Sequence, residues 1–162
     1  MIKEVRLADL YPVMKEVLDA GGTANFNPHG TSMLPMLHDD GDRVVLKKPD
    51  GELKKYDLPL YRRKNGAFVL HRVVRKPENG VYTMCGDNQW ALERGITQDQ
   101  IIGVVVEFER KGKKITVDDP MYKLYARVWV AIMPLRHLFI GGTRRLKRIA
   151  KKIFNDIRIS QK

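Results

Sequence analysis

The sequence predicts a mainly β fold of the α+β class: an antiparallel β domain with an N-terminal helix and C-terminal helices. Three observations predict it. Short apolar runs alternate with glycine-containing turns between residues 42 and 117. An apolar stripe with helical spacing precedes these runs, and a second helical pattern follows them. We therefore expect a β domain with its N-terminal helix over residues 1–118, and a helical extension over residues 119–162.

The first helix is expected over residues 7–20, capped by Asp9, with Pro12 in its first turn and Gly21-Gly22 at its end. Residues 23–28 could form an edge strand, because Pro28 could not lie in a central one. Residues 58–62 also read as an edge strand. Further strands are expected over residues 42–47, 67–74, 81–85, 101–108 and 115–117.

The C-terminal third is helical in pattern, with Asp118 or Asp119 as its cap and Pro120 near its first position. Its longest uncharged run, residues 128–135, is much shorter than the ~20 residues of a spanning helix. The N-terminus mixes charges of both signs and has no apolar run. We therefore expect no signal peptide and no transmembrane span, and a location in the cytoplasm or at the periphery of a membrane.

The net charge of +11 is concentrated in residues 141–162, which hold eight basic residues and one acidic residue. An apolar stripe from Leu146 to Ile157 lies opposite the basic face, which is typical of a helix at an anionic membrane surface. The alternative is a helix docked on its own domain or on a partner. We do not expect nucleic acid as the main partner.

Cofactor and metal chemistry have little support in the sequence. Cys85 is the only cysteine, so no intramolecular disulfide can form, and its place at the end of an apolar run indicates a buried structural thiol. The four histidines show no metal-ligand spacing. We predict no metal and no cofactor.

Two residues suggest nucleophilic chemistry. Ser32 lies in a turn after Gly30 and Thr31, where its hydroxyl would be exposed and backbone N–H groups could stabilise an oxyanion. His71 lies inside an apolar strand, where its ring needs a partner, on the face expected to carry Val69 and Val73. Taken singly, Ser32 could be an ordinary turn residue and His71 a hydrogen-bonded core histidine.

Two acids could orient His71 and stabilise its cation. Asp87 follows a strand end, and Glu93 lies six residues further on. Asp87 could instead shape an Asx-turn, and Glu93 could be a solvated carboxylate in a loop. The sequence supports Asp87 and Glu93 about equally as the acid that orients His71.

Together these segments resemble the type I signal peptidases and the LexA-like self-cleaving repressors. The similarity covers four boxes in order, over roughly half of the chain: residues 30–37 around Ser32, 41–46, 70–74 around His71, and 84–88 around Asp87. Bacterial signal peptidases have lysine before the arginine of the third box. This chain has His71 before Arg72, and in this it resembles the endoplasmic-reticulum and sporulation-type branch. Two departures from the family are expected: Gly30 stands where the bacterial branch has a hydroxyl residue, and we expect no N-terminal membrane anchor.

The resemblance implies a serine endopeptidase with Ser32 as nucleophile and His71 as general base, cutting a peptide or precursor protein bound as an added strand. It implies an oxyanion site at the N–H of Ser32, with Thr31 as a further contributor. The family favours small side chains beside the cut, and Phe26, Met33 and Pro35 are candidates to line the substrate site. The alternative is a non-catalytic module of the same fold that binds peptide or nucleic acid.

Overall fold

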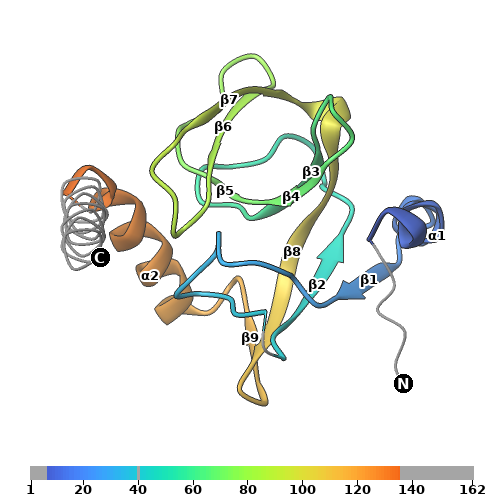
Figure 1. Cartoon of the computed structure of the whole chain (residues 1–162), viewed down its shortest axis with the longest axis horizontal. Helices are drawn as coiled ribbons and strands as arrows, with labels where there is room; N and C mark the ends of the chain where they lie inside the picture. Colours follow the sequence, from blue (N-terminus) through green and yellow to red (C-terminus); the bar gives the residue numbers. More distant parts are fainter. Residues whose placement is uncertain (1–6, 40, 136–162) are drawn as a thin grey trace, which may run out of the picture.

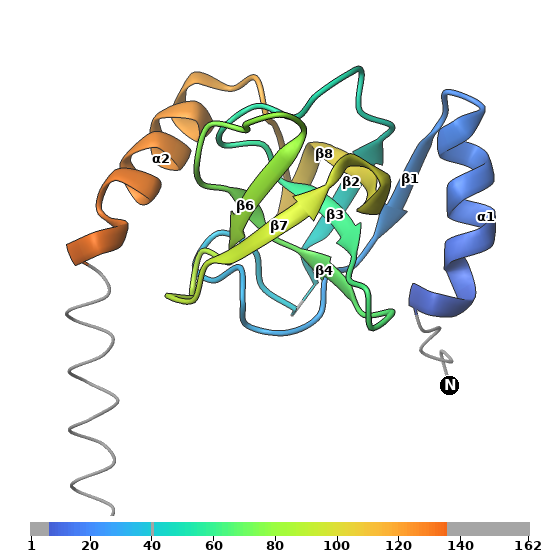
Figure 2. The ribbon, with the colours of Figure 1, turned by 90° about the horizontal axis from the view of Figure 1, so that it is seen from above.

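The computed structural model describes residues 7–39 and 41–135, which form an α+β fold with mostly antiparallel strands. Helix α1 (Leu7–Asp19) precedes the strands and helix α2 (Pro120–Ala131) follows them. The two helices lie on opposite sides of the β body (Figure 2). None of the described helices is long and apolar enough to cross a membrane.

The larger sheet has the order β1-β2-β8-β3-β4, with β9 paired to the far end of β8. All of its pairings are antiparallel, and β1 and β4 are the two end strands of this order (Figure 1). Its strands are β1 (Thr23–Phe26), β2 (Arg43–Lys47), β3 (Pro59–Arg62), β4 (Phe68–Leu70), β8 (Ile101–Arg110) and β9 (Lys113–Thr116).

The smaller sheet has the order β5-β6-β7 and is also antiparallel. Its strands are β5 (Arg72–Val73), β6 (Val81–Cys85) and β7 (Glu93–Thr97). A short 3-10 helix (Gln98–Gln100) leads from β7 into β8, so the chain passes directly from the smaller sheet to the larger one.

Most of the expected elements are confirmed, with five corrections. The strand expected over residues 67–74 is broken at His71, because β4 pairs with β3 whereas β5 pairs with β6. The strand β3 lies between β8 and β4 instead of at an edge, and Pro59 is tolerated as its first residue. Glu93 begins strand β7, an element that the sequence did not predict, so it is not a loop residue. Asp9 lies within the first turn of α1 rather than at its cap, and Pro12 lies inside the helix beyond the first turn in which it was expected.

Helix α1 follows the predicted amphipathic pattern. Met14 and Leu18 are buried in the main core, whereas Val13 is 63% exposed. The chain leaves the helix through Gly21, whose positive φ of 82° favours glycine. Burial of Leu18 stabilises this docking by about 1.5–3 kcal/mol. The helix is thereby fixed beside β1, the edge strand that leads toward Ser32 (Figure 1).

Helix α2 is capped as the sequence indicates. The Asp119 carboxylate accepts hydrogen bonds from the N–H groups of Met121 and Tyr122, and Pro120 occupies the first turn. Tyr122 then packs into the main core against Phe108. The predicted apolar stripe of the basic tail lies outside the described residues. The part of the predicted helical extension after residue 135 lies outside them as well.

Candidate functional site

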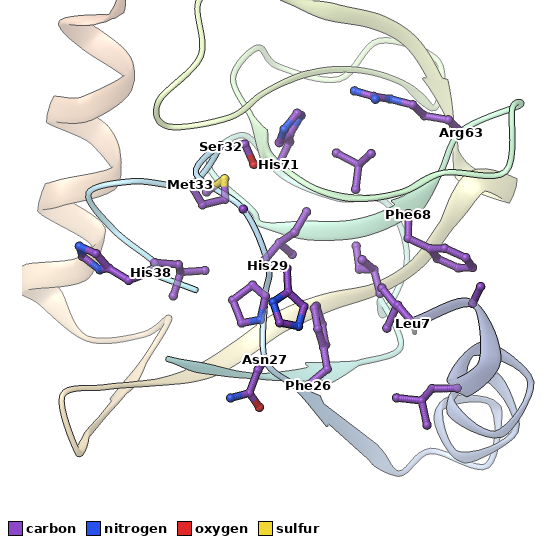
Figure 3. Close-up of a pocket in the computed structure, with 18 of the residues that line it drawn as sticks. Leu7, Phe26, Asn27, His29, Ser32, Met33, His38, Arg63, Phe68 and His71 are labelled. Atoms are coloured by element: carbon purple, nitrogen blue, oxygen red, sulfur yellow. The ribbon is translucent and has the colours of Figure 1, made fainter. Parts of the chain in front are cut away.

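The break in the chain at His71 sets this residue at the junction of the two sheets. Strand β4 ends at Leu70 in the larger sheet, and β5 begins at Arg72 in the smaller one. His71 is only 3% exposed, and its ring lines a cavity together with Ser32. Figure 3 shows the Ser32 and His71 side chains next to each other at one end of this cavity. The structure therefore brings the predicted nucleophile and the predicted base to one place.

Gly86 shows how closely the surrounding backbone fits. A Cβ atom built on Gly86 would lie 2.6 Å from the carbonyl oxygen of Ser32 and 3.1 Å from Nε2 of His71. The Nε2 edge of the ring therefore faces the same small volume as the Ser32 backbone. Asn88, two residues after Gly86, holds this loop against the Ser32 turn. Its N–H donates to the Ser32 carbonyl at 2.8 Å, and its side-chain amide donates to the Thr31 carbonyl at 3.0 Å.

The other ring nitrogen of His71 contacts a residue that the sequence did not single out. Nδ1 lies 3.2 Å from the hydroxyl oxygen of Tyr61. That hydroxyl in turn donates to Oε2 of Glu93 at 2.8 Å. Arg63 clamps the same carboxylate through two hydrogen bonds, at 2.7 Å and 2.5 Å. The chain of contacts therefore runs from His71 through Tyr61 to the Glu93–Arg63 ion pair.

These bonds define the tautomer of His71. A phenol has one proton, and Tyr61 uses it to bond the Glu93 carboxylate, so its oxygen can only accept a hydrogen bond from His71. Nδ1 must then carry the ring proton of the neutral imidazole, which leaves the lone pair on Nε2. Nε2 is the nitrogen that faces Gly86 and the Ser32 turn. We assign His71 as the Nδ1–H tautomer on this basis.

The protonation states agree with this assignment. Burial, and then the bond to Glu93, raise the pKa of Tyr61 well above its ordinary value, so the phenol keeps its proton. Burial tends to raise the pKa of Glu93, but the hydrogen bonds from Arg63 and Tyr61 hold it below the ordinary value. Burial lowers the pKa of His71 to about 4, against a partial opposing effect of Glu93. At neutral pH the site holds a carboxylate, a phenol and a neutral imidazole.

Asp87, the other candidate acid, is bound to a different partner. Its carboxylate receives two hydrogen bonds from the Arg72 guanidinium, at 2.9 Å and 2.8 Å, and one from the Tyr125 hydroxyl at 3.2 Å. Arg72 is fully buried, so Asp87 supplies the counter-charge that this cation needs. The Trp129 indole donates to the Asp87 carbonyl at 2.9 Å. These contacts tie the loop that carries Gly86 to helix α2.

The remaining predicted residues are distributed as follows. Phe26 and Met33 line the cavity beside Ser32, whereas Pro35, which follows a cis peptide bond, is not among the lining residues. Gly30 has a positive φ of 94°, a conformation that suits glycine in the turn before the nucleophile. Among the described residues, the backbone N–H of Ser32 donates to no protein acceptor, so it can reach a bound group.

Gln89 is a further residue that the sequence did not indicate. Its side chain lines the cavity, and its amide carbon lies 3.2 Å from the Cβ position built on Gly86, next to Ser32 and His71. Its position in the segment after Asn88 carries no motif of its own. Both Tyr61 and Gln89 reach the site through contacts between distant parts of the chain, and a local pattern does not reveal such contacts.

The cavity beside Ser32 has a volume of about 770 Å³. It extends from Ser32 and His71 past Phe68 of β4 and Phe26 of β1 to Leu7 of helix α1 (Figure 3). His29 and His38 also line it, and the His38 N–H donates to the buried Asp42 carboxylate at 2.8 Å. Within residues 7–39 and 41–135, no group of three or more His, Cys, Asp or Glu side chains is arranged to hold a metal ion.

Comparison of the chain with protein-family models, with curated proteins and with solved structures finds no match. The functional interpretation therefore depends on the residues and the geometry of the site.

Proposed function

We propose that the chain is a serine endopeptidase that cleaves a peptide or precursor protein, with Ser32 as nucleophile and His71 as general base. The fold we propose for it is that of the signal peptidases and LexA-like repressors, in the histidine-type branch. One observation carries the proposal: His71 is held by Tyr61 on its Nδ1 side, while its Nε2 side faces the Ser32 turn across Gly86. This is the orientation that a general base beside a serine needs.

The reaction would proceed by acyl transfer. Nε2 of His71 removes the proton of the Ser32 hydroxyl as the oxygen attacks the scissile carbonyl. The protonated His71 then gives this proton to the leaving amine, and an acyl-enzyme forms on Ser32. A water molecule, deprotonated by the same nitrogen, hydrolyses the ester and regenerates the serine.

Glu93 is the better candidate for the orienting acid, acting through Tyr61. The Tyr61 oxygen accepts from Nδ1–H and fixes the ring, while the Glu93 carboxylate provides the negative charge that stabilises the imidazolium. Arg63 holds this carboxylate in place. Asp87 supports the site indirectly, because its hydrogen bonds hold Arg72 and helix α2.

The oxyanion that forms during attack needs hydrogen-bond donors. The N–H of Ser32 is the first candidate, and the side-chain amide of Gln89 is a second one because it lies beside Ser32 and His71. Thr31 stays a further candidate from the sequence. With Gly30 two residues before the nucleophile, Gln89 would supply what a hydroxyl at that position would otherwise contribute.

The peptide would bind as an added strand between two sheet edges. Strand β1 pairs with β2 and strand β4 with β3, and each lies at one end of the sheet order. Asn25, Phe26 and Asn27 line the cavity on one side, and Phe68 and Val69 line it on the other. An extended peptide between these edges can bond to the backbone of both and bring its carbonyl to Ser32.

The cleavage test uses the small number of serines in the chain, which are Ser32 and Ser160. Full-length protein is incubated with a library of random peptides, and the products are identified by mass spectrometry. Ser32→Ala should abolish every cut that the wild type makes, whereas Ser160→Ala should retain them. Undiminished cleavage by Ser32→Ala would refute the assignment, and binding without any cleavage would favour the peptide-binding module instead.

Contact of the basic tail with an anionic membrane also stays a proposal, together with a location in the cytoplasm or at the membrane periphery. Its support is the clustering of basic residues after Gly141. Co-sedimentation with vesicles containing phosphatidylserine should require the tail. A chain ending at Gly141 that sediments equally well would contradict this proposal.

A further inference from the structure

We propose that the cavity beside Ser32 binds a bulky apolar side chain of the substrate, such as that of Leu, Phe or Met. This inference rests on the proposed function, and it names the substrate class of the same site. It differs from the preference for small side chains that the family resemblance implies. Three features of the cavity support it: its volume, its apolar far end and its position between two sheet edges.

The volume of the cavity leaves room for a bulky side chain beside the peptide backbone. At about 770 Å³ it falls in the range of pockets that enclose whole small-molecule ligands. A leucine or phenylalanine side chain directed into it would cover more of the apolar lining than an alanine would. Removal of this apolar surface from water is the source of binding free energy in an apolar pocket.

The far end of the cavity is apolar and open. Helix α1 contributes Leu7, Ala8 and Leu10 to it, and Leu10 is 39% exposed. Across from the helix lie the rings of Phe26 and Phe68 (Figure 3). A concave site lined by apolar and aromatic side chains is the kind of surface that ligand pockets have.

The polar groups of the cavity fit a peptide in an extended conformation. Successive side chains of a strand point to opposite faces, so every second side chain of an added strand can enter the cavity. The asparagines Asn25 and Asn27 lie at the β1 edge, where they can bond to a peptide backbone. No acidic side chain of the described residues lines the cavity, so nothing in it selects a basic side chain. Ser32 at one end and helix α1 at the other make the cavity continuous with the cleavage site.

The test compares peptide selection by variants of the full-length chain. The Ser32→Ala variant selects peptides from a random library by binding, and the wild type is given the same library to cut. Leu, Phe and Met should be enriched at one fixed position relative to the cut. Replacing that residue by Ala in a selected peptide should lower kcat/KM by about 10- to 100-fold.

Two substitutions in α1 test where the selectivity arises. Ala8→Trp fills the far end of the cavity and should remove the enrichment of bulky residues. Leu10→Lys adds a charge there from an exposed position and should do the same without altering the core. The matched control is Val13→Trp, which places the same indole on the same helix at a position that is 63% exposed and outside the cavity. It should select the same peptides as the parent chain.

Failure of this inference can be separated from failure of the proposed function. Cleavage with no bulky apolar preference, or a preference unchanged in both Ala8→Trp and Leu10→Lys, would overturn the inference and leave the peptidase standing. Enrichment of bulky apolar peptides by Ser32→Ala without any cleavage by the wild type would support the pocket and refute the peptidase. The absence of both binding and cleavage would overturn both.

Discussion

The hydroxyl oxygen of Tyr61 lies 3.2 Å from Nδ1 of His71 and donates its only proton to Glu93. A buried phenol thus stands between the imidazole and the carboxylate. In the familiar serine triad the acid bonds the histidine directly. Here the Glu93 carboxylate acts on His71 through Tyr61. The phenol oxygen of Tyr61 fixes both the orientation and the tautomer of the His71 ring.

Tyr61→Phe should separate orientation from packing, because it removes only the hydroxyl. The Nδ1–H of His71 would lose its acceptor, and kcat/KM should fall by about 10- to 100-fold, mainly through kcat. The matched control is Tyr82→Phe, which removes another buried hydroxyl, one that bonds Gln98 and the Leu53 N–H away from the site. A Tyr61→Phe enzyme as fast as Tyr82→Phe would show that the contact is only structural.

The two candidate acids should differ in what they affect. Asp87→Asn leaves the buried Arg72 cation without a full counter-charge, so the free energy of unfolding should fall by about 3–5 kcal/mol in urea denaturation. Glu93→Gln should cost less stability, because Glu93 and Arg63 are partly exposed, and should lower kcat instead. Loss of turnover in a fully stable Asp87→Asn, with Glu93→Gln unaffected, would reverse the assignment.

The acid limb of the pH profile should lie below the usual range of a histidine. The ordinary pKa of an imidazole is about 6.5, but burial lowers the pKa of His71 to about 4. The neutral base is therefore present above that value, and kcat/KM should hold from neutral pH down to about pH 4 before it falls. A limb between pH 6 and 7 in the free enzyme would contradict the buried, neutral His71.

The free energy of unfolding should also depend on the ionisation of His71, and should fall as the pH is lowered from 6.5 to 4. As the pH falls through 6.5, His71 of the unfolded chain takes up a proton, whereas that of the folded chain stays neutral until about pH 4. The unfolded state then binds more protons, so His71 contributes a loss of up to about 3 kcal/mol in the free energy of unfolding between pH 6.5 and 4. His71→Gln should lack this part of the loss when the two proteins are unfolded in urea across that range.

Gln89→Ala tests the second oxyanion donor. If its amide bonds the developing oxyanion, kcat should fall by about 100-fold while KM changes little. Gln98→Ala serves as the control, because the Gln98 side chain bonds Tyr82 and the Gly51 carbonyl instead of lining the cavity. A Gln89→Ala enzyme with unchanged kcat and a raised KM would limit Gln89 to a role in substrate binding.

Much of the fold follows from local patterns in the sequence. The turns at Gly66 and Gly80 and the apolar run of β8 predicted their elements because each signal lies within a few neighbouring residues. Strand β7 could not be found in this way, since of Glu93–Thr97 only Ile96 is buried. The break at His71 depends on β4 and β5 having different partner strands, which no local pattern records.

In the candidate site, too, some residues could be predicted from local sequence and others could not. Ser32 and His71 could be proposed because a histidine in an apolar strand needs a partner, and because the segments around both residues resemble the boxes of a known family in the right order. Tyr61 gave no such signal, because a tyrosine in an apolar strand is an ordinary core residue. Its partners lie 10 and 32 residues away in sequence, so its role emerges only when the sheets are assembled.

The most direct test of the central claim is covalent labelling of the full-length protein by a serine-directed fluorophosphonate probe, followed by intact-mass and peptide mapping. The wild type and Ser160→Ala should each gain one probe, on Ser32, and both Ser32→Ala and His71→Gln should gain none. An unlabelled wild type, or an adduct that persists in Ser32→Ala, would contradict a serine nucleophile activated by His71.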